Sequence, residues 1–430
     1  MSDPNSLRKA IKLRNAVALY ASSVLGSGIL VLPGLAARIA GPASIIAWIL
    51  LSVASFPFAF TFASMSARRP ESGGVYSFAK EVFGKEVATI TGWLFALWVI
   101  TGAPAVSLIA ASYLEYAFPL DRAETFLIAA GIIVVAFLIN FRGIVLSNKV
   151  QLATIACIVG LLLSAIIVSS TFVRSENFAP FLPYGLVPVG TAAALIFWSY
   201  LGYENVSNVA EEFENPKRDF QRSIILSVVL IGVLYVSISF VTIGTDAYRA
   251  GGSIAPFAAI LSNVLGRYGA AGAAILAVFI IFGAANAYTT GMSRVFYALA
   301  RDGGFPSTLA HLNEKTKVPD HALLAIPAFG LPVFLIYYFL NVNLETALLI
   351  PSGAAILVYV IGSASGVKIL GMNNQEKKVS KMLVLPAISL AMSLIILPFV
   401  GWFLLASAVV ALMALLFLRY HASNNAKSPP

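Results

Sequence analysis

The amino-acid sequence predicts an all-α integral membrane protein with 12 transmembrane helices. Of its 430 residues, 59% are hydrophobic and only 11% are charged, whereas soluble domains carry about 45–50% apolar and about 25% charged residues. A single soluble core stops growing near about 250–300 residues, so this apolar surface cannot be hidden from water. The apolar runs are continuous rather than alternating, which predicts helices and not a β-barrel. Disordered, secreted disulfide-rich and nucleic-acid-binding classes are thereby excluded.

Each span is predicted from length, because a helix needs about 20 mainly apolar residues to cross a hydrocarbon core about 30 Å thick. The first six spans are expected at residues 15–39, 44–66, 88–116, 123–141, 149–171 and 187–210. The other six are expected at residues 223–244, 269–298, 321–340, 345–367, 382–401 and 403–420. Outside the spans we expect a cytoplasmic arm at 1–14, a short external helix within 254–265 and a disordered cytoplasmic tail at 421–430.

The distribution of Lys and Arg predicts the orientation of the chain. Twelve spans place both termini on one side, and 23 of the 28 basic residues then fall on that side. The opposite side holds Arg38, Arg122, Arg174, Arg249 and Arg267. Positively charged loops stay in the cytoplasm. We therefore expect a multi-pass protein of the cell membrane with both termini cytoplasmic. Its partner is expected to be the lipid bilayer, and its net charge of +9 is not taken to indicate binding to nucleic acid.

The first span contains a predicted break. Gly26, Ser27 and Gly28 follow one another near its middle, and Pro33 comes five residues later. Glycines permit the helix to unwind, and Pro33 suits the first turn of a restarted helix. Unsatisfied backbone groups are costly in hydrocarbon, so such a cluster needs a reason. The alternative reason is a close helix–helix contact made by small residues.

The sequence of the sixth span favours a helix break, rather than a close helix–helix contact, as the reason for the glycines of the first span. It reads Phe197-Trp198-Ser199-Tyr200-Leu201-Gly202-Tyr203-Glu204 and contains the one acidic residue that we place inside a span. Interruptions in the first and sixth spans are expected of two five-helix inverted repeats with a site near the midplane. The repeats would cover residues 15–171 and 187–367, followed by two helices at 382–420.

Two broken helices predict a chemistry for that site. The restarted half after Gly28 presents free N–H groups and a positive dipole end, which attract a carboxylate. The half that ends near Phe197–Tyr200 presents carbonyls and a negative end, which suit an ammonium group. A site with both ends is complementary to a zwitterionic α-amino acid. Ser22, Ser23 and Ser27 could add hydroxyl contacts, and Trp198 or Phe197 could close over the ligand.

At these residues the sequence resembles the amino acid–polyamine–organocation superfamily of transporters, over nearly its whole length. Gly26-Ser27-Gly28-Ile29 is similar to the first-helix motif that binds the substrate carboxylate. The segment from Phe197 to Glu204 resembles the sixth-helix motif, with an aromatic gate, which implies substrate contacts at Tyr200, Leu201 and Gly202. Two further segments, residues 214–224 and 293–303, are similar to motifs of the same superfamily. In the first of them, Gln221 stands where proline is usual. The resemblance implies a LeuT-like fold, a secondary transporter and not an enzyme.

Residues 91–95 and 102–105 resemble the bacterial branch that exports methionine and branched-chain amino acids. Trp98, Ile100, Ala105 and Val106 supply apolar surface on the third span, so we expect a neutral substrate such as leucine, isoleucine, valine or methionine. The alternative is an exchanger of cationic or small polar amino acids or of polyamines. Export or uptake, and the oligomeric state, stay open.

The sequence predicts less about how transport is coupled to a proton or another ion. Some relatives carry a lysine on the fifth helix, but here the matching place is Ile158 or Cys157, which puts a lysine-based proton cycle in doubt. An intramembrane carboxylate is costly to bury, so Glu204 is expected either to couple and gate transport or to cap the following half-helix. Asn286 could face the first helix for coupling, or could make an interhelical hydrogen bond. Proton or other ion coupling is possible.

The remaining polar residues suggest no chemistry of their own. Arg294 is expected to extend toward the interface as a membrane anchor, and 211–222 is expected to be a solvated loop with possible gate contacts. The sequence has no nucleophile elbow, phosphate loop or dinucleotide fingerprint. The spacing of the three histidines does not resemble a metal site, so neither a cofactor nor a metal is expected. They are His311, His321 and His421.

Overall fold

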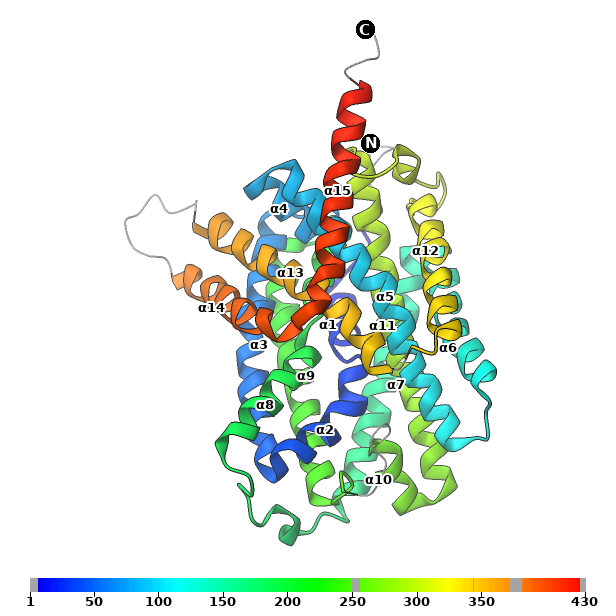
Figure 1. Cartoon of the computed structure of the whole chain (residues 1–430), viewed down its shortest axis with the longest axis vertical. Helices are drawn as coiled ribbons and strands as arrows, with labels where there is room; N and C mark the ends of the chain where they lie inside the picture. The colour runs from blue at the N-terminus through cyan, green and yellow to red at the C-terminus, as the bar shows by residue number, and fades with distance from the viewer. Residues whose placement is uncertain (1–6, 250–255, 343, 372–380, 426–430) are drawn as a thin grey trace.

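The chain folds into a bundle of α-helices, shown in Figure 1. The computed structural model describes residues 7–249, 256–342, 344–371 and 381–425. Within these ranges there is no β-strand, and extended backbone pairs only in two isolated bridges, between Ile11 and Phe213 and between Ser72 and Val209. The all-helical membrane fold expected from the continuous apolar runs is confirmed.

The helices of the first half follow the predicted spans, with a short helix added between the second and third. They are α1 (Leu13–Val24), α2 (Ser27–Ala40), α3 (Ser44–Arg68), α4 (Val75–Phe83), α5 (Lys85–Ala117), α6 (Arg122–Phe141) and α7 (Ile144–Ser170). The first span is divided into α1 and α2, as the glycines predicted. Pro33 lies in the second turn of α2 rather than its first, where it leaves the carbonyl one turn earlier without a helical hydrogen bond.

The second half begins with another interrupted span. Its helices are α8 (Leu186–Phe197), α9 (Pro216–Gly244), α10 (Pro256–Leu265), α11 (Arg267–Arg301), α12 (Asp320–Phe339), α13 (Leu344–Gly371), α14 (Lys381–Ile396) and α15 (Leu404–Asn425). The short helix expected within 254–265 is present as α10 over 256–265, while 254–255 lie outside the described residues; its external position stays a prediction. The prediction of a disordered tail from residue 421 is wrong for residues 421–425, because α15 continues to Asn425. Residues 426–430 lie outside the described part.

Ten helical stretches of the described chain are long and apolar enough to cross a membrane. One of them, Ser27–Arg68, has 42 residues and contains both α2 and α3. Leu383–Ile396, at the predicted eleventh span, is apolar but shorter than the others. The chain is therefore a multi-pass membrane protein, whereas the count of 12 and the division into two repeats stay predictions.

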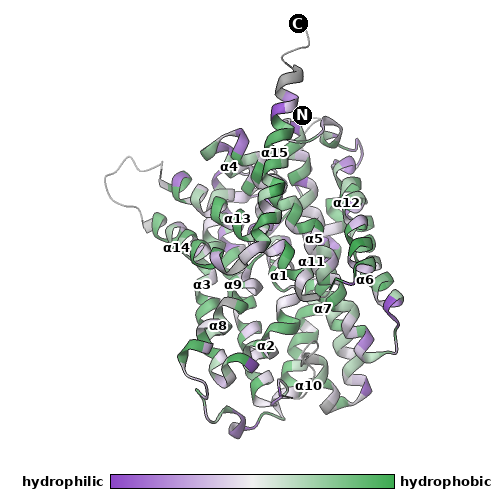
Figure 2. Cartoon of the chain, in the orientation of Figure 1, coloured by the Kyte–Doolittle hydropathy of each residue, from purple (hydrophilic) through white to green (hydrophobic). Residues whose placement is uncertain are grey.

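The helices between the two ends of the bundle consist mostly of hydrophobic residues (Figure 2). Leu127 on α6, Ile167 on α7 and Val229 on α9 are 72%, 65% and 60% exposed, a pattern that lipid and not water accommodates. The long helices α5 and α11 pack against each other inside the bundle, and α11 also contacts α6 and α7. This arrangement places α11 between the surface helices and the broken segments.

The ends of the bundle carry the polar segments. Helix α4, the N-terminus of α12 and the C-terminal end of α15 lie at one end, and α10 lies at the other (Figure 1). These three segments, all predicted to be cytoplasmic, therefore share one end of the described chain.

The predicted orientation can be tested by cysteine labelling. We expect a cysteine at Glu176 to react with a membrane-impermeant maleimide in intact cells, because this exposed residue lies between α7 and α8 on the predicted outer side. A cysteine at Glu314, also exposed, should react only after permeabilisation. Both substitutions belong in a Cys157→Ala background, since the native cysteine is exposed. The opposite labelling pattern would invert the assigned orientation.

Candidate functional site

The first element of the site is the gap between α1 and α2. Helix α1 ends at Val24, and the Gly26 N–H turns back to the Val24 carbonyl at 2.7 Å. Helix α2 then begins at Ser27 without any side-chain cap. Its first N–H groups, on Ser27, Gly28 and Ile29, have no carbonyl one turn earlier to bind. The positive end of the α2 dipole is thus left open inside the bundle.

The second element is the interruption after α8. Helix α8 ends at Phe197, and the chain continues as short 3₁₀ turns at Trp198–Tyr200, Asn205–Asn208 and Ala210–Glu212. Between the first two turns, Gly202 adopts a φ of +132°, a conformation that favours glycine. The sixth span therefore does not restart as an α-helix, and the negative end of α8 lies at the break.

The two breaks are pressed against each other, and glycine makes this possible. A Cβ on Gly28 would lie 2.2 Å from the Ser199 Oγ, and a Cβ on Gly202 would lie 2.6 Å from the Ser23 carbonyl oxygen. The Tyr235 hydroxyl of α9 lies 2.8 Å from the Val24 carbonyl and 3.0 Å from the Ser199 carbonyl. One phenol thus stabilises the backbone of both breaks at once. The glycines permit both the unwinding of the helix and the close contact between segments. The two explanations that the sequence allowed, a helix break and a close packing contact, therefore both apply.

A cavity of about 90 Å³ lies at this junction. A single water requires only about 10–15 Å³ on such a measure, so the space suits a small molecule. Both breaks, α5 and α11 supply its walls. The lining residues are Ser23, Val24, Gly26, Ser27, Gly28, Trp98, Val99, Gly102, Ala103, Val106, Trp198, Ser199, Leu201, Ala284, Ala285 and Tyr288.

Six of the expected substrate contacts line this cavity: Ser23, Gly26, Ser27, Gly28, Trp198 and Leu201. Five others lie around it: Ser22, Ile29, Phe197, Tyr200 and Gly202. Phe197 packs edge-on against Phe58, with ring centroids 5.5 Å apart. The Tyr200 hydroxyl bonds to the Ser52 hydroxyl at 2.7 Å, which points it toward α3. On the third span, Trp98 and Val106 reach the cavity, whereas Ile100 and Ala105 do not.

Glu204 lies beside the cavity and is completely buried. Its Oε2 accepts hydrogen bonds from the Gly202 N–H at 3.0 Å and from the Tyr359 hydroxyl. Its Oε1 accepts one from the Tyr288 hydroxyl at 3.2 Å, and Tyr288 lines the cavity. The carboxylate does not cap the following turn. Within the described chain it is held by phenols and a backbone N–H, with no cation paired to it.

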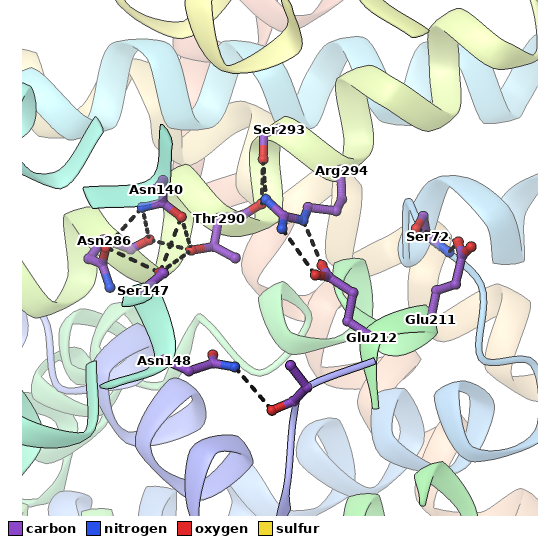
Figure 3. A network of polar contacts seen from close by, with 11 residues as sticks. Ser72, Asn140, Ser147, Asn148, Glu211, Glu212, Asn286, Thr290, Ser293 and Arg294 are labelled. Atoms are coloured by element: carbon purple, nitrogen blue, oxygen red, sulfur yellow. Dashed lines mark hydrogen bonds and ion pairs between the residues drawn. The ribbon is translucent and has the colours of Figure 1, made fainter. Parts of the chain in front are cut away.

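Asn286 belongs to a buried polar network rather than to the cavity wall (Figure 3). Its Nδ2 donates to the side-chain Oε1 of Gln151 on α7, and its Oδ1 accepts from Asn140 Nδ2 of α6 at 2.8 Å. Thr290 and Ser147 complete the network. The interhelical hydrogen bond allowed by the sequence is therefore present, and a coupling role stays a prediction.

The two candidates for the place of the lysine found in some relatives, Ile158 and Cys157, face different ways, and Ile158 points into the bundle. This side chain is fully buried, and its tip would lie 3.3 Å from a Cβ on Gly283 of α11. Ser22 of α1 would lie 3.4 Å from the same point. Cys157 instead faces outward. Where α1, α7 and α11 meet, the chain offers a methyl group and not an ammonium group.

Arg294 is not a membrane anchor that reaches the interface. It is 1% exposed, and its guanidinium makes two bonds to the Glu212 carboxylate, of 2.7 and 3.1 Å (Figure 3). The solvated loop expected at 211–222 is accordingly wrong, because Glu212 and Asp219 are fully buried and α9 already begins at Pro216. Burial raises the pKa of Glu212, and the Arg294 charge opposes that shift. Nearby, Glu211 accepts a 2.6 Å bond from the Ser72 hydroxyl. These contacts attach the segment after the second break to α11 and to the turn before α4.

Three tyrosines that bind the broken segments were missed in the sequence. Tyr235, Tyr288 and Tyr359 come from α9, α11 and α13, and all three hydroxyl groups bind groups of the two breaks. A tyrosine inside an apolar span is a weak signal, because its ring packs well in any core. Only the distant partners show that these hydroxyl groups act at the site.

The contact between the breaks predicts a rescue experiment. Gly28→Ala should lower the free energy of unfolding by about 1–3 kcal/mol, as overpacking does, because the new methyl group meets Ser199. Ser199→Gly in the same chain removes the Oγ and Cβ involved and should recover most of the loss. Gly190→Ala on α8 is the control, since a Cβ there meets nothing within 4 Å. The readout is denaturation of purified protein in detergent; no recovery in the double variant would refute the contact.

The buried ion pair predicts a large stability difference between two carboxylates. Glu212→Gln leaves Arg294 buried without a countercharge and should destabilise the protein by about 3–5 kcal/mol. Glu214→Gln removes the partner of Lys12, an exposed pair 3.8 Å apart, and should cost at most about 1 kcal/mol. The same denaturation assay compares them. Equal losses in the two variants would contradict the structural role given to Glu212.

Comparison with known proteins agrees with this architecture. A family model described as amino acid permease matches residues 11–422. The uncharacterized amino acid permease YecA of Bacillus subtilis is 34% identical over 422 residues, which cover 98% of each chain. The L-methionine/branched-chain amino acid exporter YjeH of Escherichia coli is 29% identical, over 85% of this chain and 87% of the exporter. The methylthioribose transporter of Bacillus subtilis is 31% identical, over 99% and 96%.

These matches cover the broken helices, the cavity and the buried ion pair together, and the family and these relatives are permeases and transporters rather than enzymes. The resemblance to the amino acid–polyamine–organocation superfamily is thereby confirmed, and the chain belongs to the amino acid permease family.

Proposed function

We propose that this permease carries neutral, apolar amino acids across the cell membrane by alternating access, with leucine, isoleucine, valine or methionine as substrate. The observation that carries the proposal is the composition of the cavity wall. Both broken helices reach it, and none of its lining residues in the described chain is charged. We propose the orientation with both termini cytoplasmic.

The backbone ends would hold the common part of the substrate. A carboxylate at the start of α2 would meet N–H groups of Ser27, Gly28 and Ile29 together with a positive dipole end. An ammonium group near Trp198 and Ser199 would meet the negative end of α8. Burial of a charge is expensive without such partners, so the pair of ends favours a molecule that carries both charges.

The rest of the wall would select the side chain. Trp98, Val99, Val106, Trp198 and Leu201 present apolar surface to the cavity. Each buried methylene of a substrate gains about 0.8 kcal/mol, whereas a charged side chain would lose its water here without gaining a countercharge. A branched aliphatic or thioether side chain fits this wall. The name of the Escherichia coli relative, an L-methionine/branched-chain amino acid exporter, agrees with this chemistry.

The alternative is a cationic or small polar amino acid or a polyamine, and one contact favours it. Tyr288 lines the cavity and bonds to Glu204, so a cationic side chain that displaced this phenol would reach a carboxylate. The methylthioribose transporter adds a neutral thiosugar to the substrates that must be tested. A polyamine or a thiosugar would leave the positive end of α2 without a carboxylate, whereas a cationic or small polar amino acid would use both helix ends and is disfavoured only by the apolar, uncharged wall.

Counterflow in proteoliposomes tests the substrate. We expect liposomes preloaded with unlabelled leucine or methionine to accumulate trace labelled leucine transiently, because the carrier exchanges both. Liposomes preloaded with arginine, glutamate, a polyamine or methylthioribose should not accumulate it. Protein-free liposomes with the same contents provide the control for leak. Accumulation of labelled leucine with arginine inside would add a cationic substrate to the neutral one, and no accumulation with any content would remove leucine as a substrate.

Glu204 is the proposed coupling residue, since it is a buried carboxylate beside the cavity and the fifth span has no lysine after Lys149. Glu204→Gln keeps an oxygen acceptor at one of the two positions and places an amide NH₂ at the other, where a tyrosine hydroxyl can accept, but it cannot exchange a proton. We therefore expect leucine exchange at about the unaltered rate and loss of accumulation driven by a pH gradient. Glu211→Gln, a carboxylate outside the cavity wall, is the control. If Glu204→Gln still accumulates leucine with the same pH dependence, coupling does not use this residue.

A further inference from the structure

Three ligand-bearing side chains that are not part of the transport site meet in the segment between α11 and α12. They are His311, directly after the 3₁₀ turn Ser307–Ala310, and Asp320 and His321, at the start of α12. One ligand atom from each lies within 4.8 Å of the others. The two imidazole rings are stacked, with centroids 4.4 Å apart and planes inclined by 22°. The sequence spacing concealed this cluster, because the loop folds back on itself.

The hydrogen bonds fix how each histidine can present its second nitrogen. His321 Nδ1 lies 2.9 Å from the Thr308 carbonyl oxygen, which can only accept, so this nitrogen carries the proton. His311 Nδ1 lies 2.6 Å from Asp320 Oδ1, which as a carboxylate likewise accepts. Neither Nε2 has a hydrogen-bond partner in the described part of the chain. Both Nε2 atoms are therefore available as ligands when the imidazoles are neutral.

This arrangement is typical of histidines that bind metals. A metal-ligating histidine almost always donates its other ring N–H to a carboxylate or a backbone carbonyl, which sets the tautomer and the ring direction. Here His311 has the carboxylate partner and His321 has the carbonyl partner. An ion from solution can also reach the site, because the His311 side chain is 50% exposed.

Asp320 orients His311 and does not itself reach the ion. Its Oδ1 accepts from His311 and from the His321 backbone N–H at 2.9 Å, while Oδ2 has a weak 3.5 Å contact with Asn313. The two ring nitrogens of an imidazole point away from each other, so a carboxylate bonded at Nδ1 lies on the far side of the ring from an ion bound at Nε2. The Asp320 side chain is only 14% exposed, which positions it firmly.

We propose that the Nε2 atoms of His311 and His321 bind a divalent transition-metal cation of the zinc class, with Asp320 as the hydrogen-bond partner that orients His311. Two imidazole nitrogens and two waters would complete the tetrahedral set that Zn²⁺ prefers. Imidazole donors also favour Zn²⁺ over Mg²⁺ or Ca²⁺, which take oxygen ligands. The bound ion would join the 3₁₀ turn that follows α11 to the first turn of α12. This site is independent of the substrate proposed for the cavity.

Titration of the full-length protein, freed of any affinity tag, with ZnCl₂ in an isothermal calorimeter tests the site. We expect one saturable Zn²⁺ per chain and a higher midpoint of thermal unfolding with Zn²⁺ but not with MgCl₂. Asp320→Asn should weaken binding about 10–100-fold, and the double variant His311→Ala, His321→Ala should abolish it. His421→Ala is the matched control, because this third histidine lies on α15 and bonds within its own helix. Its affinity should equal that of the unaltered chain.

Cobalt gives a readout that does not depend on stability. CoCl₂ bound to the unaltered protein should show the intense visible absorption of a tetrahedral ion with nitrogen ligands, and the double variant should lack it. Leucine counterflow by the double variant shows that it is folded. Absence of saturable Zn²⁺ binding, binding that survives in the double variant, or loss of binding in His421→Ala would each overturn the proposal.

Discussion

The cost of leaving backbone N–H and C=O groups unbonded in hydrocarbon constrains the whole molecule. Two interrupted segments, after Val24 and after Phe197, carry such groups inside the bundle, and each is placed where the other and a set of tyrosines cover it. Contact between them requires glycine at two points, Gly28 and Gly202, where any Cβ would overlap the opposite segment. The cavity lies between these two segments, next to the backbone groups that no other part of the described chain binds.

Helix α11 connects this cavity to one end of the bundle. Ala284, Ala285 and Tyr288 face the cavity, Thr290 joins the polar network with α6 and α7, and Arg294 holds Glu212. These residues cover about three turns, or about 15 Å of helix. Glu212 in turn belongs to the segment that follows the second break. A change in the position of that segment must therefore either move α11 or break a buried ion pair, so the cavity and the loop are mechanically linked.

The sequence predicted what depends on local pattern. Continuous apolar runs indicated the helices, Gly26-Ser27-Gly28 indicated the first break, and Glu204 stood out because a carboxylate in a span is rare. What it could not predict depends on distant partners. The phenols of Tyr288 and Tyr359 lie 84 and 155 residues from Glu204, and the partner of Arg294 lies 82 residues away. Helix periodicity also ends at an unwound segment, so nothing in the order Phe197, Trp198, Tyr200 says that only Trp198 faces the cavity. The loop that joins His311 to His321 concealed their meeting for the same reason.

Competition by substrate analogues tests most directly whether the two half-helix ends hold an amino acid by its two charges. Displacement of labelled leucine from the purified permease would be measured with leucine, with 4-methylpentanoate, which lacks the amine, and with 3-methylbutylamine, which lacks the carboxylate. The account predicts that unlabelled leucine displaces the label and that neither analogue does so at a hundredfold excess, about 2.7 kcal/mol of lost affinity. Displacement by either analogue at the concentration that suffices for leucine would contradict the account, because one of the two helix ends would then contribute nothing to binding.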